Sequence, residues 1–121
     1  MLKQMSSTSP RQQRVASAKA DEPRHVVEDV PGLDELAKAL LTMRTPDEAK
    51  RFLRDLCTLS ELEALAHRWQ IVRLLDRKIP YLEIADRVQT STATVTRVAQ
   101  WLRHGAGGYA LALARSGRKS R

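Results

Sequence analysis

Cysteine is nearly absent from this chain, because Cys57 is the single one among 121 residues. One thiol excludes an internal disulfide and is typical of proteins of the reducing cytosol. We expect Cys57 to be a small, buried apolar residue of a helix. No apolar run approaches the ~18 residues that a membrane-spanning helix needs, so the sequence predicts a cytoplasmic protein.

Aromatic residues are also scarce, at 4% of the chain, so any core must be aliphatic. An aliphatic core is small at this length, and small helical domains often gain burial by forming dimers. Groups for catalysis are missing as well: no carboxylate pair, no nucleophile beside a base and no spacing of metal ligands stands out. The sequence therefore predicts a protein that is not an enzyme and has no metal or cofactor.

Positive charge is present in excess and is concentrated toward the C-terminus. Residues 1–30 hold five basic and four acidic side chains, and residues 31–96 hold ten of each. From Arg97 to the end there are six basic residues and no acidic one. Such a segment favours a nucleic-acid partner, although basic charge alone also occurs in other soluble proteins.

The hydrophobic pattern divides the chain into three regions. Residues 1–30 are polar and have no sustained period, so we expect a disordered tail. Residues 31–116 show helical periodicity, so we expect one all-α domain there. Residues 117–121 are basic, and we expect a mobile end. The string "GAGG" at residues 105–108 follows no strand, so we expect it to end a helix rather than bind a nucleotide.

Three amphipathic segments precede the threonine-rich part of the chain, at residues 32–43, 45–57 and 58–78. The third is apolar over much of its circumference, which is typical of a helix at the centre of a bundle or a dimer. Two of them begin with the signature of a capping box. These start signals are Thr45 with Glu48, and either Thr58 with Glu61 or Ser60 with Glu63.

The segment Tyr81–Leu102 is predicted to be a helix-turn-helix. Ala85 is the small residue that the helix crossing requires, and Ser91 suits the N-cap of the second helix. Gln89 departs from the pattern, because a glycine is usual at this turn, where the backbone often has positive φ. Apolar residues occupy the inward positions of both helices: Ile84, Val88, Val95, Val98 and Leu102.

The hydroxyl side chains of this segment then face outward. At the start of the second helix they suit the major groove, where threonine can hydrogen-bond a base and its methyl can meet a thymine methyl. We predict base contacts from Thr92, Ala93, Thr96 and Arg97. We predict phosphate contacts from Thr90, Ser91, Thr94 and Arg103. The alternative is that these are ordinary exposed residues of a structural helical hairpin.

The strings "LCTLSELEALAHRWQIVRLL" and "IADRVQTSTATVTRV" resemble the tryptophan-repressor superfamily, and most closely its YerC/YecD branch. The resemblance covers residues 33–114. It implies an all-helical, intertwined homodimer with one helix-turn-helix per subunit. It also implies a bacterial transcription regulator that binds operator DNA.

In the repressor of this family two arginines hold the corepressor tryptophan, and the resemblance places Arg68 and Arg97 at these positions. The rest of the pocket differs, because Val98 stands where the family has a glycine and Trp101 where it has a serine. A branched side chain at Val98 should occupy the space of the indole, so we expect no tryptophan corepressor. The two arginines would then form ion pairs, Arg97 would contact phosphate, or both would hold a smaller ligand.

Three functions stay open on the sequence alone. The first is a dimeric, sequence-specific DNA-binding regulator without a tryptophan switch. The second is a regulator gated by another small molecule near Arg68 and Arg97. The third is a protein-interaction module, in which the helix-turn-helix is a scaffold and the basic tail binds an acidic partner.

Overall fold

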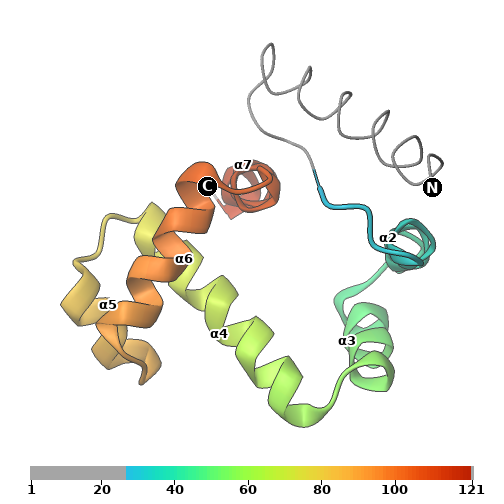
Figure 1. Cartoon of the computed structure of the whole chain (residues 1–121), viewed down its shortest axis with the longest axis horizontal. Coiled ribbons are helices and arrows are strands. Elements are labelled where there is room, and N and C mark those ends of the chain that lie inside the picture. Colours follow the sequence, from blue (N-terminus) through green and yellow to red (C-terminus); the bar gives the residue numbers. More distant parts are fainter. Residues whose placement is uncertain (1–26, 121) are drawn as a thin grey trace, which may run out of the picture. The chain divides into compact units, whose positions relative to one another are not determined.

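The computed structural model describes residues 27–120, and the side chains of residues 27–116. This part of the chain is all-helical and has no strand, as the sequence predicted. The chain forms two compact units, one of Glu28–Val98 and one that includes Ala99–Arg121. Most of the predicted disordered tail, residues 1–26, lies outside the described residues. The helices are α2 (Leu33–Leu40), α3 (Pro46–Leu56), α4 (Leu59–Asp76), α5 (Tyr81–Val88), α6 (Thr92–His104) and α7 (Gly108–Ser120) (Figure 1).

Thr45 caps α3, as predicted. Its hydroxyl accepts the backbone N–H of Glu48 at 3.1 Å, and Pro46 is the first residue of the helix. The return bond of the capping box differs from the prediction, because the Glu48 carboxylate accepts the N–H of Arg44 at 2.8 Å and not that of Thr45. A glutamate side chain is long enough to reach either amide, so the sequence pattern identifies the cap but not the reciprocal partner.

Cys57 separates α3 from α4, and our expectation of a buried helical residue was wrong. Its backbone is extended, with φ −115° and ψ 152°, and its side chain is half-buried. The chain leaves helical geometry here because Thr58 must be extended to cap α4. The Thr58 hydroxyl accepts from the N–H of Glu61 at 3.1 Å, and the Glu61 carboxylate accepts from the N–H of Thr58 at 2.8 Å. The start signal at Ser60 is therefore not used.

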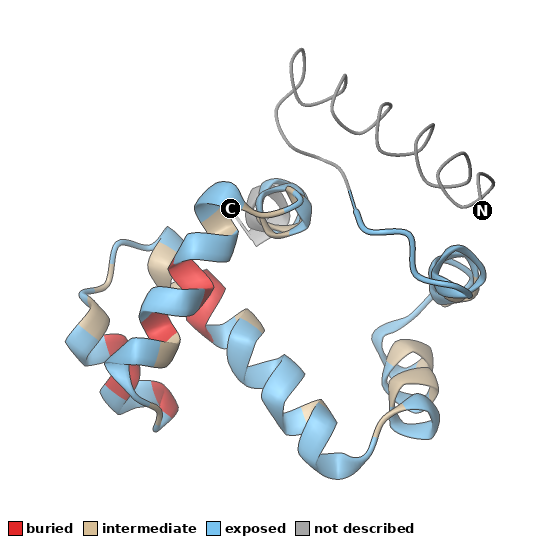
Figure 2. Ribbon diagram, in the orientation of Figure 1, coloured by how far each residue is buried: buried red, intermediate tan, exposed pale blue. Residues whose placement is uncertain are grey.

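All eight buried residues of the described part belong to α4, α5 and α6. Ile71, Val72, Ile84 and Val95 have no exposed surface. Figure 2 shows the buried residues, in red, where the C-terminal part of α4 meets α5 and α6. Burying one such side chain stabilises the fold by roughly 1.5–3 kcal/mol. The core is aliphatic, as the scarcity of aromatic residues required, and it is the core of the helix-turn-helix.

The turn between α5 and α6 has positive φ without a glycine. Gln89 adopts φ 62°, and Lys78, in the turn before α5, adopts φ 63°. The N–H of Thr90 donates to the carbonyl of Ala85 at 2.9 Å, a bond typical of helices that end in this conformation. Gln89 also donates its side-chain Nε2 to the carbonyl of Asp86 at 3.1 Å. The side chain of Gln89 thus stabilises a turn that its backbone alone would disfavour.

The loop between α6 and α7 requires Gly105. A Cβ at this position would lie 2.4 Å from the carbonyl oxygen and 2.6 Å from Cε3 of Trp101. The "GAGG" string therefore ends a helix, as predicted. Helix α7 continues through Gly117 to Ser120, within the residues for which we expected a mobile end, and a glycine inside a helix costs only about 1 kcal/mol.

Candidate nucleic-acid interface

Ser91 fixes the start of α6. Its Oγ accepts the N–H of Thr94 at 3.1 Å and also lies 3.1 Å from Oγ1 of Thr94. Ser91 is therefore the N-cap that the sequence predicted. Two hydroxyls predicted to contact phosphate are thus already hydrogen-bonded to each other, so a phosphate would have to share or replace that bond.

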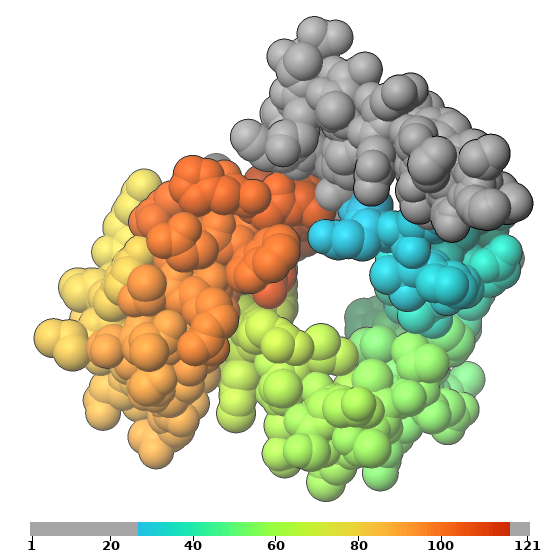
Figure 3. Space-filling view, in the orientation of Figure 1, coloured from blue at the N-terminus to red at the C-terminus, as the bar shows by residue number. Residues whose placement is uncertain are grey.

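The outer and inner sides of α6 divide as predicted at Val95 and Val98, whereas Leu102 is only half-buried and Ala99, which we did not predict, is buried. Val95 and Val98 form the inner side and are 0% and 4% exposed. The space-filling view shows the atoms of α6, in orange, open at the surface (Figure 3). The four residues predicted to contact bases are all exposed: Thr92, Ala93, Thr96 and Arg97. Short hydroxyls, one methyl and one cation are therefore available to a partner at the start of this helix.

Thr90 precedes the cap and is half-buried. It lines a shallow recess together with Ala85, Asp86 and Gln89. Arg103 lies near the end of α6, and its side chain is exposed. The predicted contact residues therefore run from the turn to the last turn of this helix.

Arg68 and Arg97, the candidate effector ligands, are both exposed. Neither forms an ion pair with another described residue, so the ion pairs we considered for them are absent from this part of the chain. Val98 is buried directly after Arg97, where we expected it to fill the pocket. Trp101 is 59% exposed, so of the two residues that replace the family's glycine and serine only Val98 is buried.

Charge along the chain is balanced before the turn and positive after it. The exposed pairs Asp34–Lys38 and Asp47–Arg51 have N–O distances of 3.1 and 3.5 Å, and Glu83 pairs with Arg87 on α5. Asp86 is the last acidic residue, and residues 87–121 contain none. We did not predict Asp86 as a site residue, although its position before this acid-free segment is visible in the sequence.

Two other kinds of site are not found among residues 27–120. Each helix there is too short or too polar to span a bilayer. No cluster of three His, Cys, Asp or Glu side chains within this range could hold a metal ion. The polar features that the described structure brings together are those of the turn and of α6.

The family model of the Trp repressor protein matches residues 31–117. The chain belongs to the Trp repressor family. It is 37% identical over 83 residues to the protein YerC of Bacillus subtilis strain 168, an alignment that spans 69% of this chain and 80% of YerC. The resemblance to the YerC branch is therefore confirmed. This family consists of helix-turn-helix transcription regulators rather than enzymes.

Two solved structures are similar to the chain. One is a TrpR-like protein from Eubacterium eligens ATCC 27750, with a TM-score of 0.69 and 34% identity, covering 74% of this chain and 92% of that protein. The other is a candidate Trp repressor from Staphylococcus aureus, with a TM-score of 0.68 and 34% identity, covering 74% and 89%. The all-α, Trp-repressor-like fold is thus confirmed.

Proposed function

We propose that this protein is a sequence-specific DNA-binding regulator that reads the major groove with the start of α6. The observation that carries this function is the division of α6 into a buried aliphatic side and an exposed side. On the exposed side, Thr92, Ala93 and Thr96 provide hydroxyls and methyls that match base edges, and Arg97 adds a cation. The side chains on the exposed side do not pack in the core, so the stability of the fold does not determine which residues stand there.

Phosphate contacts supply the affinity in this proposal. Arg103 and the acid-free segment after Asp86 provide the positive charge, and Thr90, Ser91 and Thr94 provide hydroxyls near the N-terminus of α6. Neutralising phosphates releases counterions, so binding should weaken steeply as salt rises. Replacing Arg103 with Ala should weaken all duplexes about equally, whereas Thr92→Val should change which sequences bind.

A second copy of the chain is part of the proposal. Helices α2 and α3 contain no buried residue, and α4 also carries exposed leucines. Large apolar side chains gathered on an exposed surface are typical of an interface. Here they are Leu33, Leu40, Leu41, Leu56, Leu59 and Leu65. A homodimer would cover them and present two copies of α6 to a palindromic site.

Tryptophan is not the proposed switch, because Val98 is buried and we expect its branched side chain to take the space that the indole would need. Arg68 and Arg97, exposed and without ion pairs in the described part, favour a second candidate: a regulator gated by a different small anion. A shift in thermal stability with amino acids or related anions would support that candidate.

The deciding experiment is selection of bound duplexes from a random DNA pool at physiological salt, with and without tryptophan. A palindromic consensus recovered equally in both arms supports the proposal. A consensus only with tryptophan would show that Val98 leaves room for the ligand. No consensus in either arm, with affinity no better than that of a generic basic protein, would favour the protein-interaction module.

A further inference from the structure

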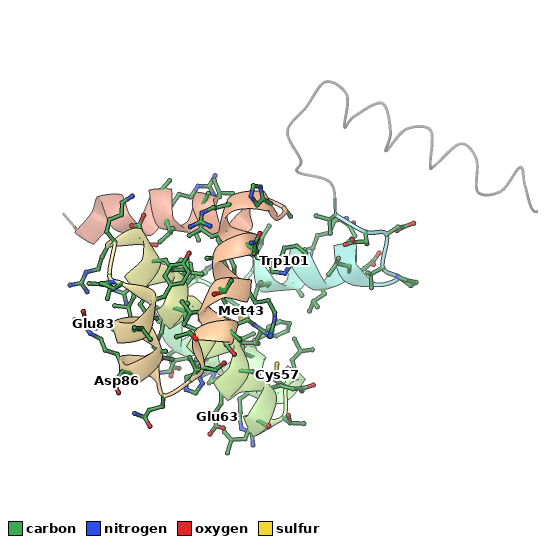
Figure 4. The ribbon with its side chains drawn as sticks, turned by 60° about the vertical axis from the view of Figure 1, so that its left-hand side comes forward. Met43, Cys57, Glu63, Glu83, Asp86 and Trp101 are labelled. Carbon is green, nitrogen blue, oxygen red and sulfur yellow. The ribbon has the colours of Figure 1, made fainter. Side chains whose placement is uncertain are left out.

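Asp86 is the last acidic residue of the chain and lies just before the turn that leads into α6. It is exposed. It lines the recess with Gln89 and Thr90, directly before the capped start of α6. Figure 4 shows its side chain and that of Glu83 on the outer edge of α5.

The Asp86 carboxylate forms no contact among the described residues that would stabilise the fold. It forms no ion pair or hydrogen bond with another described side chain, since only the backbone carbonyl of Asp86 accepts the Gln89 amide. Asp86 also lies in the last turn of α5, where the negative end of the helix dipole disfavours a carboxylate. Glu83 differs in both respects, because it lies in the first turn and pairs with Arg87.

We propose that Asp86 is a specificity-determining residue of the DNA interface, which takes the exocyclic amino group of a cytosine or adenine. This inference rests on the proposed function. In a helix-turn-helix, the first helix crosses the DNA backbone and the N-terminal residues of the second contact base edges, so we expect a residue beside the turn to lie near both phosphates and bases. A carboxylate accepts from the amino group of cytosine, whereas a phosphate repels it.

The carboxylate therefore acts differently on two classes of DNA. On the selected sequence it accepts a hydrogen bond, and its desolvation is compensated. On a random sequence it stays unpaired beside phosphates, and like charges at an interface suppress binding. Asp86 thus increases the difference in binding affinity between selected and random DNA. Cationic side chains that contact phosphates cannot do so alone, because every sequence carries the same phosphates.

The test uses the full chain and two fluorescent duplexes of equal length, one from the selection experiment and one of scrambled sequence. Anisotropy at physiological salt gives the dissociation constants for the native protein and for Asp86→Ala, Asp86→Asn and Glu83→Gln. Glu83→Gln is the control for the loss of one negative charge from the same outer edge of α5, and it differs in that it also releases Arg87 from its ion pair. Circular dichroism and the thermal midpoint establish that each variant is folded.

We expect Asp86→Ala to bind the scrambled duplex roughly three- to tenfold more tightly and to lower the selected-to-scrambled ratio about tenfold. Asp86→Asn should gain the same affinity for scrambled DNA but lose less of the ratio, because its amide oxygen can still accept. Repeating the selection with Asp86→Ala should remove the preference for cytosine or adenine at one position of each half-site.

Equal ratios for the native protein, Asp86→Ala and Glu83→Gln would overturn this inference while leaving the proposed function in place. A native protein that prefers no sequence would overturn the proposed function, and the inference with it. The native protein's own ratio separates these two failures.

Discussion

The helix-turn-helix and the N-terminal helices differ in how far a single chain buries their apolar side chains. Every buried residue of the described part lies in α4, α5 or α6, whereas α2 and α3 contribute none. Both regions have helices with apolar side chains at helical spacing, and each contains a side-chain N-cap, Thr45 for α3 and Ser91 for α6. Amphipathic periodicity is therefore sufficient to specify a helix, whereas burial of its apolar face requires another element that packs against it. One chain provides that for the helix-turn-helix, and the second copy that we propose would provide it for α2 and α3.

The largest effect that this comparison predicts is the loss of a core side chain. Ile84→Ala should lower the free energy of unfolding by about 3 kcal/mol, because Ile84 has no exposed surface and a cavity would remain. Leu82→Ala is the control on the same helix, since Leu82 is 76% exposed, and it should change stability by less than about 0.5 kcal/mol. Urea denaturation followed by circular dichroism measures both. Similar losses for the two variants would contradict a core centred on α5.

A charged substitution on the apolar surface of α2 and α3 tests whether a second copy of the chain covers it. Leu41 is 83% exposed in one chain, so Leu41→Asp should leave the helix-turn-helix folded. If a second copy covers it, the substitution should weaken dimerisation by about 2 kcal/mol, or roughly thirtyfold in the dissociation constant. Light scattering at micromolar protein would then give a monomer mass for Leu41→Asp and a dimer mass for Leu82→Asp. Unchanged dimers would place the interface elsewhere.

The capping box of α4 has a smaller effect. Thr58→Ala should lower the free energy of unfolding by about 1 kcal/mol, because the N–H of Glu61 loses its acceptor. Thr58→Ser retains the hydroxyl and should be nearly neutral. Thermal unfolding of the two variants side by side is sufficient, and equal midpoints would mean that α4 does not depend on this cap.

The smallest predicted change in stability concerns Gln89, the residue with positive φ in the turn between α5 and α6. Gln89→Gly should stabilise the protein by about 0.5 kcal/mol, because glycine relieves the left-handed backbone while the side-chain bond to Asp86 is lost. Gln89→Ala loses the bond without relieving the backbone and should destabilise. Chemical denaturation can rank all three proteins. If the alanine variant matched the native protein, the Gln89 side chain would contribute nothing to this turn.

Much of the fold could be predicted because local patterns were consistent with it. The caps at Thr45, Thr58 and Ser91 follow from short-range hydrogen bonding, which depends on neighbours three residues away. The inward positions of α5 and α6 follow from the helical period. The conformation of Cys57 could not be predicted, because it depends on where two competing start signals place the next helix. The partner of Glu48 is similar, since two amides lie within its reach.

Some features of the candidate site could likewise be predicted from the sequence, and others could not. Exposure of Thr92, Ala93, Thr96 and Arg97 follows from the period of α6, so the sequence predicts it. Two other features depend on the conformation in which α5 ends, which the sequence does not give. They are the hydrogen bond between Ser91 and Thr94 and the recess beside Asp86. That Arg68 and Arg97 form no ion pair within the described part of the chain also became visible only in the structure, because the sequence offers acidic residues that could pair with them.

By itself the sequence determined the helices, the two faces of α6, the acid-free C-terminal charge and the family, since each depends on residue type and local spacing. Which apolar faces one chain buries and which stay open became visible only in the folded structure. The same holds for Asp86, whose carboxylate has no partner among the side chains of residues 27–116. The physical reason is that burial and pairing depend on distances between residues far apart in the chain, whereas periodicity and capping do not.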